Sequence, residues 1–283
     1  MENYSLVVES GADLPKRVIE KYGIKVVPMH IELNGQWLDD GTIPVEELFT
    51  YYERTGLLPK TSGCNPADFG KVFDQLYQEF PNKQIIHLAY SAETTCSYQS
   101  AKLAAENRPY ITSINTKNVS AGQAVIVEKT AKFIEKNPTI TVEEIQLFVT
   151  TLIEKVHMCF LPETLLYLKA GGRVNNPTYL GAKLLNLKPL IEVIEGRLVS
   201  TKKYRGSMRI ASQKLLQEYP EKYHFQKDKL TLICGLGLPE EIKAQVEAAA
   251  KELGFNQLEW IPTGGVVSVH GGPSAFGMVG IST

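Results

Sequence analysis

The first half of the chain alternates between two hydrophobic periods. Short apolar runs with the length of strands are followed by segments in which apolar residues recur every three or four positions, as on one face of a helix. This alternation predicts an α/β unit, a mainly parallel sheet with helices on both faces. The predicted strands are residues 4–10, 24–33, the start of 84–105, and 110–115. The predicted helices are residues 16–22, a segment starting near Pro44, 67–80, the end of 84–105, 120–136 and 141–155.

Two features predict local departures from this alternation. Pro28 lies within the second apolar run, and because proline cannot donate a hydrogen bond to a sheet, that strand should bend or lie at an edge. The sequence Asn34-Gly35-Gln36 is typical of a turn. We expect the segment WLDDGT, residues 37–42, to lead into the helix near Pro44.

Beyond residue 155 the pattern changes. Residues 188–206 predict a β-hairpin that turns at Glu195-Gly196, and two strands joined by a tight turn belong to an antiparallel or mixed sheet. We therefore predict a second domain of α+β type, with domains at 1–155 and 156–283. Its other predicted elements are strands at 157–162, 229–234, 257–261 and within 275–282, and helices at 163–174, 206–218 and 239–253.

A polar turn with four hydroxyl side chains interrupts residues 84–105, between the strand and the helix. The hydroxyls belong to Ser91, Thr94, Thr95 and Ser97. The first turn of a helix carries unpaired backbone N–H groups and a partial positive charge, so a turn placed there can hold an anion. Hydroxyl groups would add donors that bring no counter-charge.

A second hydroxyl-bearing turn, Thr61-Ser62-Gly63, precedes the helix at 67–80. Ligands of parallel sheets bind beyond the carboxyl ends of the strands, where such turns gather. Serine and threonine are also favoured as helix caps and turn formers, an alternative that residue type leaves open. The turns expected to share one mouth are 9–13, 61–66, 91–97 and 116–120.

His270 is followed by Gly271 and Gly272, which would let backbone approach a ligand beside a titratable donor. The alternative is an incidental histidine in a loop before the last strand. Arg173 follows a pair of glycines that end a helix, where its guanidinium could clamp a carboxylate, a phosphate or an acidic group of a partner.

A small basic patch consists of Lys202, Lys203 and Arg205, in the second strand of the predicted hairpin and the turn after it. Such a patch is more often a solvated face than a binding site. The charge of the whole chain points to no polyanion, because 30 Lys and Arg stand against 31 Asp and Glu. Aromatic residues are not interleaved with basic clusters, so we expect no nucleic-acid partner.

The start of the chain lacks the basic and apolar regions of a signal peptide, and no apolar run approaches the roughly 20 residues that span a bilayer. We expect a cytoplasmic protein with no stable membrane insertion. The cysteines show no C-x-x-C spacing, which argues against a zinc site and a disulfide framework. They are Cys64, Cys96, Cys159 and Cys234.

Enzyme motifs are mostly missing. No P-loop, GxSxG or HExxH sequence occurs, and no GxGxxG follows a strand. We therefore expect neither a metal nor a cofactor.

Several segments, in order from end to end, resemble the DegV family of fatty-acid-binding proteins. Two of them, ETLLYLKAGGRVN and KPLIEVIEG, lie at the separation usual in that family. The segments are 9–15, 26–28, 60–69, 97–101, 163–175, 180–198 and 270–277.

This resemblance implies a two-domain, non-catalytic carrier that holds one long-chain fatty acid in a tunnel between its domains. A separate kinase subunit would convert the presented carboxylate to an acyl phosphate for phospholipid synthesis. Carried over by position, the carboxylate would meet Thr61, Ser62, Ser91, Thr95, Cys96, His270 and Gly271. The kinase would dock on Arg173, Lys202 and Arg205.

The chain departs from the family pattern at two places. Glu9 stands where aspartate is usual, and Thr94-Thr95-Cys96-Ser97 replaces Leu-Ser-Gly-Thr. Two other functions remain open: an enzyme acting on a small phosphorylated or carboxylated metabolite with His270 as acid or base, and a regulatory module that senses acyl chains. A long apolar tunnel would favour the carrier, and a small polar pocket the enzyme.

Overall fold

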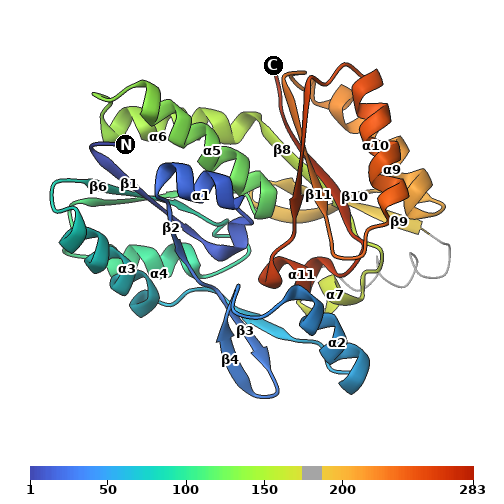
Figure 1. Cartoon of the computed structure of the whole chain (residues 1–283), viewed down its shortest axis with the longest axis horizontal. Coiled ribbons are helices and arrows are strands. Elements are labelled where there is room, and N and C mark those ends of the chain that lie inside the picture. The colour runs from blue at the N-terminus through green and yellow to red at the C-terminus, as the bar shows by residue number, and fades with distance from the viewer. Residues whose placement is uncertain (174–186) are drawn as a thin grey trace.

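A computed structural model describes residues 1–173 and 187–283 (Figure 1). It confirms the predicted mixed α/β architecture: one sheet is parallel, and a second is mixed. The resemblance segments at 163–175 and 180–198 lie partly outside the described residues. Within these, no helix is both long and apolar enough to cross a membrane.

The first sheet has the strand order β2-β1-β6-β7, and all its strands are parallel. Its strands are β1 (Tyr4–Glu9), β2 (Lys25–Val27), β6 (Gln84–Ala89) and β7 (Ile111–Asn115). After β1 the chain adds β2 on one side of it and later adds β6 and β7 on the other side. The direction of strand addition therefore reverses between β1 and β6. Ligands of such sheets bind at this reversal, beyond the carboxyl ends of the strands.

Helices cover both faces of the parallel sheet (Figure 1). Residues on one face of the sheet pack against α3 and α4, and residues on the other pack against α1, α5 and α6. The helices are α1 (Lys16–Tyr22), α3 (Pro66–Glu79), α4 (Ser97–Ala105), α5 (Ser120–Lys136) and α6 (Val142–Lys155).

The prediction of one strand over residues 24–33 is wrong. The chain leaves the parallel sheet at Pro28, and β3 (His30–Leu33) enters a separate antiparallel sheet of order β4-β3-β5. The segment expected to lead into a helix first forms β4 (Gln36–Asp39). Asn34 and Gly35 both have positive φ, which suits a two-residue hairpin turn. The remaining elements of this part are β5 (Lys60–Ser62) and α2 (Val45–Thr55).

The second sheet has the order β10-β9-β8-β13-β11-β12. Only the β11–β12 pairing is parallel among its described neighbours. The hairpin turns at Glu195-Gly196, as predicted. The strands are β8 (Val156–Leu161), β9 (Leu187–Ile194), β10 (Arg197–Arg205), β11 (Lys229–Cys234), β12 (Gln257–Pro262) and β13 (Phe276–Ile281).

One face of the second sheet packs against α9 and α10, and the other faces α5. Residues of β8, β11 and β13 thereby join the hydrophobic core of the first sheet, so the two sheets share one core through α5. His270, for which a loop was the alternative, lies in a short helix. The helices are α7 (Leu166–Ala170), α9 (Met208–Lys222), α10 (Glu240–Glu252) and α11 (Gly265–Gly271).

The hairpin of the second sheet touches the hydroxyl turn of the first. Ser91 is buried, and its hydroxyl donates to the carbonyl oxygen of Gly196 at 2.7 Å. A Cβ atom at Gly196 would lie 2.5 Å from Ser91 Oγ. Glycine is therefore required there both for the turn and for this contact.

We predict that Gly196→Ala destabilises the protein more than Gly35→Ala. Both glycines have similar positive φ in hairpin turns, +80° and +78°, but nothing lies within 4 Å of a Cβ atom at Gly35. Gly35→Ala should cost about 1–2 kcal/mol for the left-handed backbone, and Gly196→Ala a further ~1–3 kcal/mol for overpacking. Urea unfolding of the two variants checks this, and equal losses would contradict it.

Candidate functional site

A cavity lies between the carboxyl ends of β1 and β6 and the second sheet. About 860 Å³ in it is free of atoms, part of which is open to solvent. Its described lining residues are Met29, Thr61, Ser62, Gly63, Tyr90, Thr94, Thr95, Val119, Ser120, Met158, Phe160, Leu168, Arg173, Leu198, Ile233, Thr263, Val266, Val267, His270, Gly271 and Ala275.

The side of the cavity formed by the second sheet is apolar and elongated. Phe160 on β8 and Ile233 on β11 are both paired with Gly277, so they lie at one level of the sheet. Met158 is paired with Val279, two residues further along. Because a strand rises about 3.4 Å per residue, the apolar wall extends roughly 13 Å from the level of Ala275 to that of Met158.

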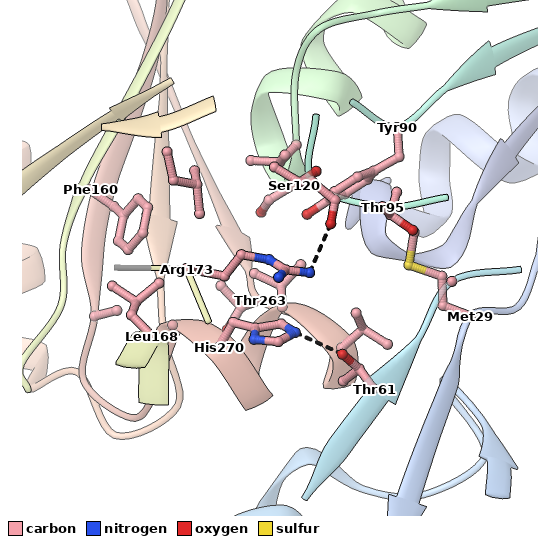
Figure 2. Close-up of a pocket in the computed structure, with 18 of the residues that line it drawn as sticks. Met29, Thr61, Tyr90, Thr95, Ser120, Phe160, Leu168, Arg173, Thr263 and His270 are labelled. Carbon is pink, nitrogen blue, oxygen red and sulfur yellow. Dashed lines mark hydrogen bonds between the residues drawn. The ribbon is translucent and has the colours of Figure 1, made fainter. Parts of the chain in front are cut away.

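Thr61 and His270 meet at the polar end of the cavity. The atoms Thr61 Oγ1 and His270 Nε2 are 2.7 Å apart, which indicates a hydrogen bond (Figure 2). Thr61 is held in β5 by its pairing with Ile31, whereas His270 lies in the last turn of α11. The site is thus assembled from opposite ends of the chain.

The environment of His270 keeps its ring neutral. Burial, with a smaller contribution from the Arg173 guanidinium, lowers the pKa of His270 to about 4. Its buried Nδ1 atom has no hydrogen-bond partner among the residues that the structure describes. A Cβ atom at Gly171 would lie 2.1 Å from this nitrogen, so the first glycine of the Gly171-Gly172 pair makes room for the ring.

The unpaired Nδ1 atom favours one tautomer of His270. A buried N–H group without an acceptor is rarer in proteins than an under-satisfied acceptor, so the proton belongs on Nε2. Nε2–H then donates to Thr61 Oγ1, and the Thr61 hydroxyl is left to donate into the cavity.

Arg173 supplies positive charge to the cavity. Its guanidinium donates to the carbonyl oxygen of Thr94 at 2.8 Å and to that of Gly171 at 2.9 Å. The side chain is partly buried, and its guanidinium lies between His270 and Ser120 in the close-up (Figure 2). With His270 neutral, Arg173 is the one cation among the described residues that line the cavity.

The two hydroxyl-bearing turns, 61–63 and 94–97, pack against each other, and both contribute residues to the lining of the cavity. A Cβ atom at Gly63 would lie 2.3 Å from Thr95 Oγ1 and 2.6 Å from Ser97 Oγ, so only glycine permits this approach. The Ser97 hydroxyl accepts a hydrogen bond from the backbone N–H of Cys64 at 3.0 Å. Thr95 lines the cavity, but Ser97 holds the turns together.

The predicted ligand residues divide into two groups. Thr61, Ser62, Thr95, His270 and Gly271 line the cavity. The other two do not: Ser91 bonds to the hairpin, and Cys96 is exposed before α4.

The predicted docking residues also separate. Arg173 lies in the cavity, whereas Lys202 and Arg205 are exposed on β10. Lys202 forms an ion pair with Glu218 at 2.6 Å. Its positive charge is therefore partly neutralised, whereas no ion pair to Arg205 occurs among the described residues.

Sequence reasoning did not single out several lining residues. Ser120 begins α5 with positive φ, and it belongs to the turn 116–120 that was expected at the mouth. Thr263 comes just before α11. Met29 follows Pro28, where the chain leaves the parallel sheet. Tyr90 immediately follows β6, a position that the rule for parallel sheets would have indicated.

Groups suited to metal binding or covalent chemistry are scarce in the described part of the chain. No cluster of three or more His, Cys, Asp or Glu side chains could hold a metal ion there. The thiols of Cys64, Cys159 and Cys234 are buried, and burial raises the pKa of each. The cavity offers hydroxyl donors, one neutral imidazole and one guanidinium, beside an apolar wall.

Comparisons with known proteins give a consistent result. A DegV domain-containing protein of Caldanaerobacter subterraneus is 27% identical over 98% of both chains. A structure described as fatty acid binding of a DegV family protein from Thermus thermophilus has a TM-score of 0.88 at 24% identity, covering 99% of this chain and 100% of that one.

The Streptococcus pneumoniae fatty acid kinase (Fak) B3 protein, whose structure is loaded with linoleic acid, has a TM-score of 0.85 at 19% identity, covering 99% of this chain and 100% of that one. These structural neighbours, at under 25% identity, share the fold. The family model for uncharacterised proteins of the DegV family matches residues 3–283. The chain therefore belongs to the DegV family.

Proposed function

We propose that this protein holds one long-chain fatty acid in the cavity and presents its carboxylate to a partner kinase in the cytoplasm. The observation that carries the proposal is the composition of the cavity: an apolar wall leads to a polar end with Thr61, His270 and Arg173. The structural neighbour described as fatty acid binding and the one loaded with linoleic acid support the ligand class. The predicted domains, 1–155 and 156–283, would each supply one side of the cavity.

The tail should dominate the affinity. Burying one methylene stabilises a complex by about 0.8 kcal/mol, so a tail of ~15 methylenes offers roughly 12 kcal/mol before costs. Association costs about 4–15 kcal/mol, and each charge-assisted hydrogen bond to the head returns ~1.5–3 kcal/mol. The hydroxyl groups therefore mainly orient the head.

The carboxylate of the fatty acid would be held by a series of hydrogen bonds that starts at His270. His270 Nε2–H donates to Thr61 Oγ1, so the Thr61 hydroxyl can donate to a carboxylate oxygen. Thr95 adds a second hydroxyl from the facing turn, and Arg173 adds charge. We assign Arg173 to the head rather than to docking because it lines the cavity.

Two features weigh against the alternative of an enzyme with His270 as acid or base. General acid–base catalysis works best with a pKa near the operating pH, whereas that of His270 is about 4. In hydroxyl–imidazole catalysis the second ring nitrogen is oriented by a carboxylate, but no described residue is a hydrogen-bond partner of His270 Nδ1. The pair is suited to fixed hydrogen bonding.

The partner kinase is the least direct part of the proposal. Its support is the fold shared with a protein named as part of a fatty acid kinase. Lys202 and Arg205 remain the proposed docking residues, with Arg205 the stronger candidate because Lys202 is already paired with Glu218.

The carrier function predicts that the purified protein contains one fatty acid per chain. Native mass spectrometry of the folded protein, followed by denaturing extraction, measures the bound species and its chain length. A preparation that has met no detergent, is folded, and still takes up no added palmitate would contradict the function.

We predict that Thr61→Ala impairs presentation of the head more than retention of the tail. Loss of one charge-assisted hydrogen bond should weaken binding by ~1.5–3 kcal/mol, a small part of the gross tail energy. Phosphorylation of bound acid by a fatty acid kinase should fall much further, and Thr61→Ser should restore it. Complete loss of lipid from Thr61→Ala would count against this division of roles.

We predict that acid destabilises the wild type more than His270→Gln, which cannot titrate. The folded-state pKa of about 4 lies below the ordinary 6.5, so the contribution of neutral His270 is complete above pH 6.5 and is lost as the pH falls toward 4. The stability difference between the two proteins should shift by up to about 3 kcal/mol over that range. Urea unfolding at several pH values measures it, with exposed His224→Gln as control, and a constant difference would refute the expectation.

A further inference from the structure

The short helix α11, which carries His270, is held at its start by two carboxylates from the first part of the chain. Asp13 Oδ1 accepts the backbone N–H of Gly264 at 2.8 Å, and Asp40 Oδ1 accepts that of Val266 at 3.2 Å. Asp13 follows β1, and Asp40 follows β4. Two loops from the first 40 residues thus converge on the start of a helix near the other end of the chain.

Glycines make this convergence possible. A Cβ atom at Gly264 would lie 2.7 Å from Asp13 Oδ1, and one at Gly265 would lie 2.5 Å from Asp40 Oδ1. Any other residue would push the carboxylates away from the helix. The Gly264-Gly265 pair is therefore matched to the two acids.

A helix of seven residues has little stability of its own, so its placement depends on external contacts. The far end of α11 is held by the bond between His270 and Thr61. Both ends of α11 are therefore fixed to the same part of the chain, residues 13–61. Asp13 also bonds to the hydroxyl of Ser120, which lines the cavity.

We propose that Asp13 and Asp40 are positioning residues that fix α11 and thereby place His270 against Thr61. The inference deepens the proposed function, because it rests on the head-group role given to that pair. Neither acid lines the cavity, so each acts through the helix.

The role depends on hydrogen bonds rather than charge. Burial raises the pKa of Asp40 and that of Asp13, the latter to about 8, while bonds from Ser120 and Gly264 oppose the rise at Asp13. Asparagine matches the shape of Asp13 and keeps an oxygen that can accept the hydrogen bond from Gly264. Alanine removes the acceptor.

The test observes the imidazole ring directly and needs no ligand. The whole chain, labelled with ¹⁵N-histidine, gives ring signals from five histidines, and His270→Gln identifies those of His270. Thr61→Ala provides the reference for a ring whose Nε2 has lost its partner. Asp13→Ala plus Asp40→Ala should move the His270 signals at least half of the way to that reference, whereas Asp13→Asn should leave them near the wild-type position.

Glu144→Ala is the matched control, because Glu144 also accepts hydrogen bonds at a helix start but is exposed at the surface on α6. A folded double variant with wild-type His270 signals would overturn the proposal. If that variant does not fold, Asp40→Ala and Gly264→Ala each test it separately, and unchanged His270 signals in both would overturn it equally.

A second readout separates this proposal from the carrier function. Bound [1-¹³C]palmitate reports on the head through its carboxyl signal, which should move in Asp13→Ala and Asp40→Ala but not in Glu144→Ala. A wild type that binds no palmitate would refute the carrier function, while the His270 signals would still decide the positioning role.

Discussion

The hydrogen bond between Thr61 and His270 joins residues 209 positions apart, and the polar end of the cavity depends on it. Thr61 lies in the separate antiparallel sheet and His270 in α11, so the bond forms only if these two parts of the chain are held in one arrangement. The shared core around α5 supplies the large apolar contribution, and the Ser91–Gly196 contact and the acids at α11 set the local geometry. The site is therefore a property of the junction and of neither sheet alone.

At several points around the cavity, glycine lets the backbone approach a polar side chain closely. Gly63, Gly171, Gly196 and Gly264 each face a polar side chain at a distance that a Cβ atom would not allow. Gly63, Gly171 and Gly264 do not have a positive φ. The lack of space for a Cβ atom, and not the backbone conformation, therefore requires glycine at these three positions. In this chain glycine marks contacts across the site as much as it marks turns.

Local pattern predicts most of the fold, because the hydrophobic period and turn residues act over a few positions. It could not predict long-range partners. Ser91 and Thr95 lie in one turn and look alike in sequence, yet Ser91 meets the hairpin and only Thr95 reaches the cavity. The helix that carries His270 could not be predicted from local pattern, because the acids that stabilise it lie more than 200 positions earlier. Pro28 signalled a bend, but not that the chain would join another sheet.

The apolar wall of the cavity links occupancy of the cavity to the stability of the protein. Val119, Met158 and Ile233 line the cavity and also belong to the core that joins the two sheets. A molecule that fills this space completes the core and raises the free energy of unfolding by mass action. Copies with an empty cavity would unfold more often and meet proteases sooner, so the supply of a bound molecule would set how long the protein persists.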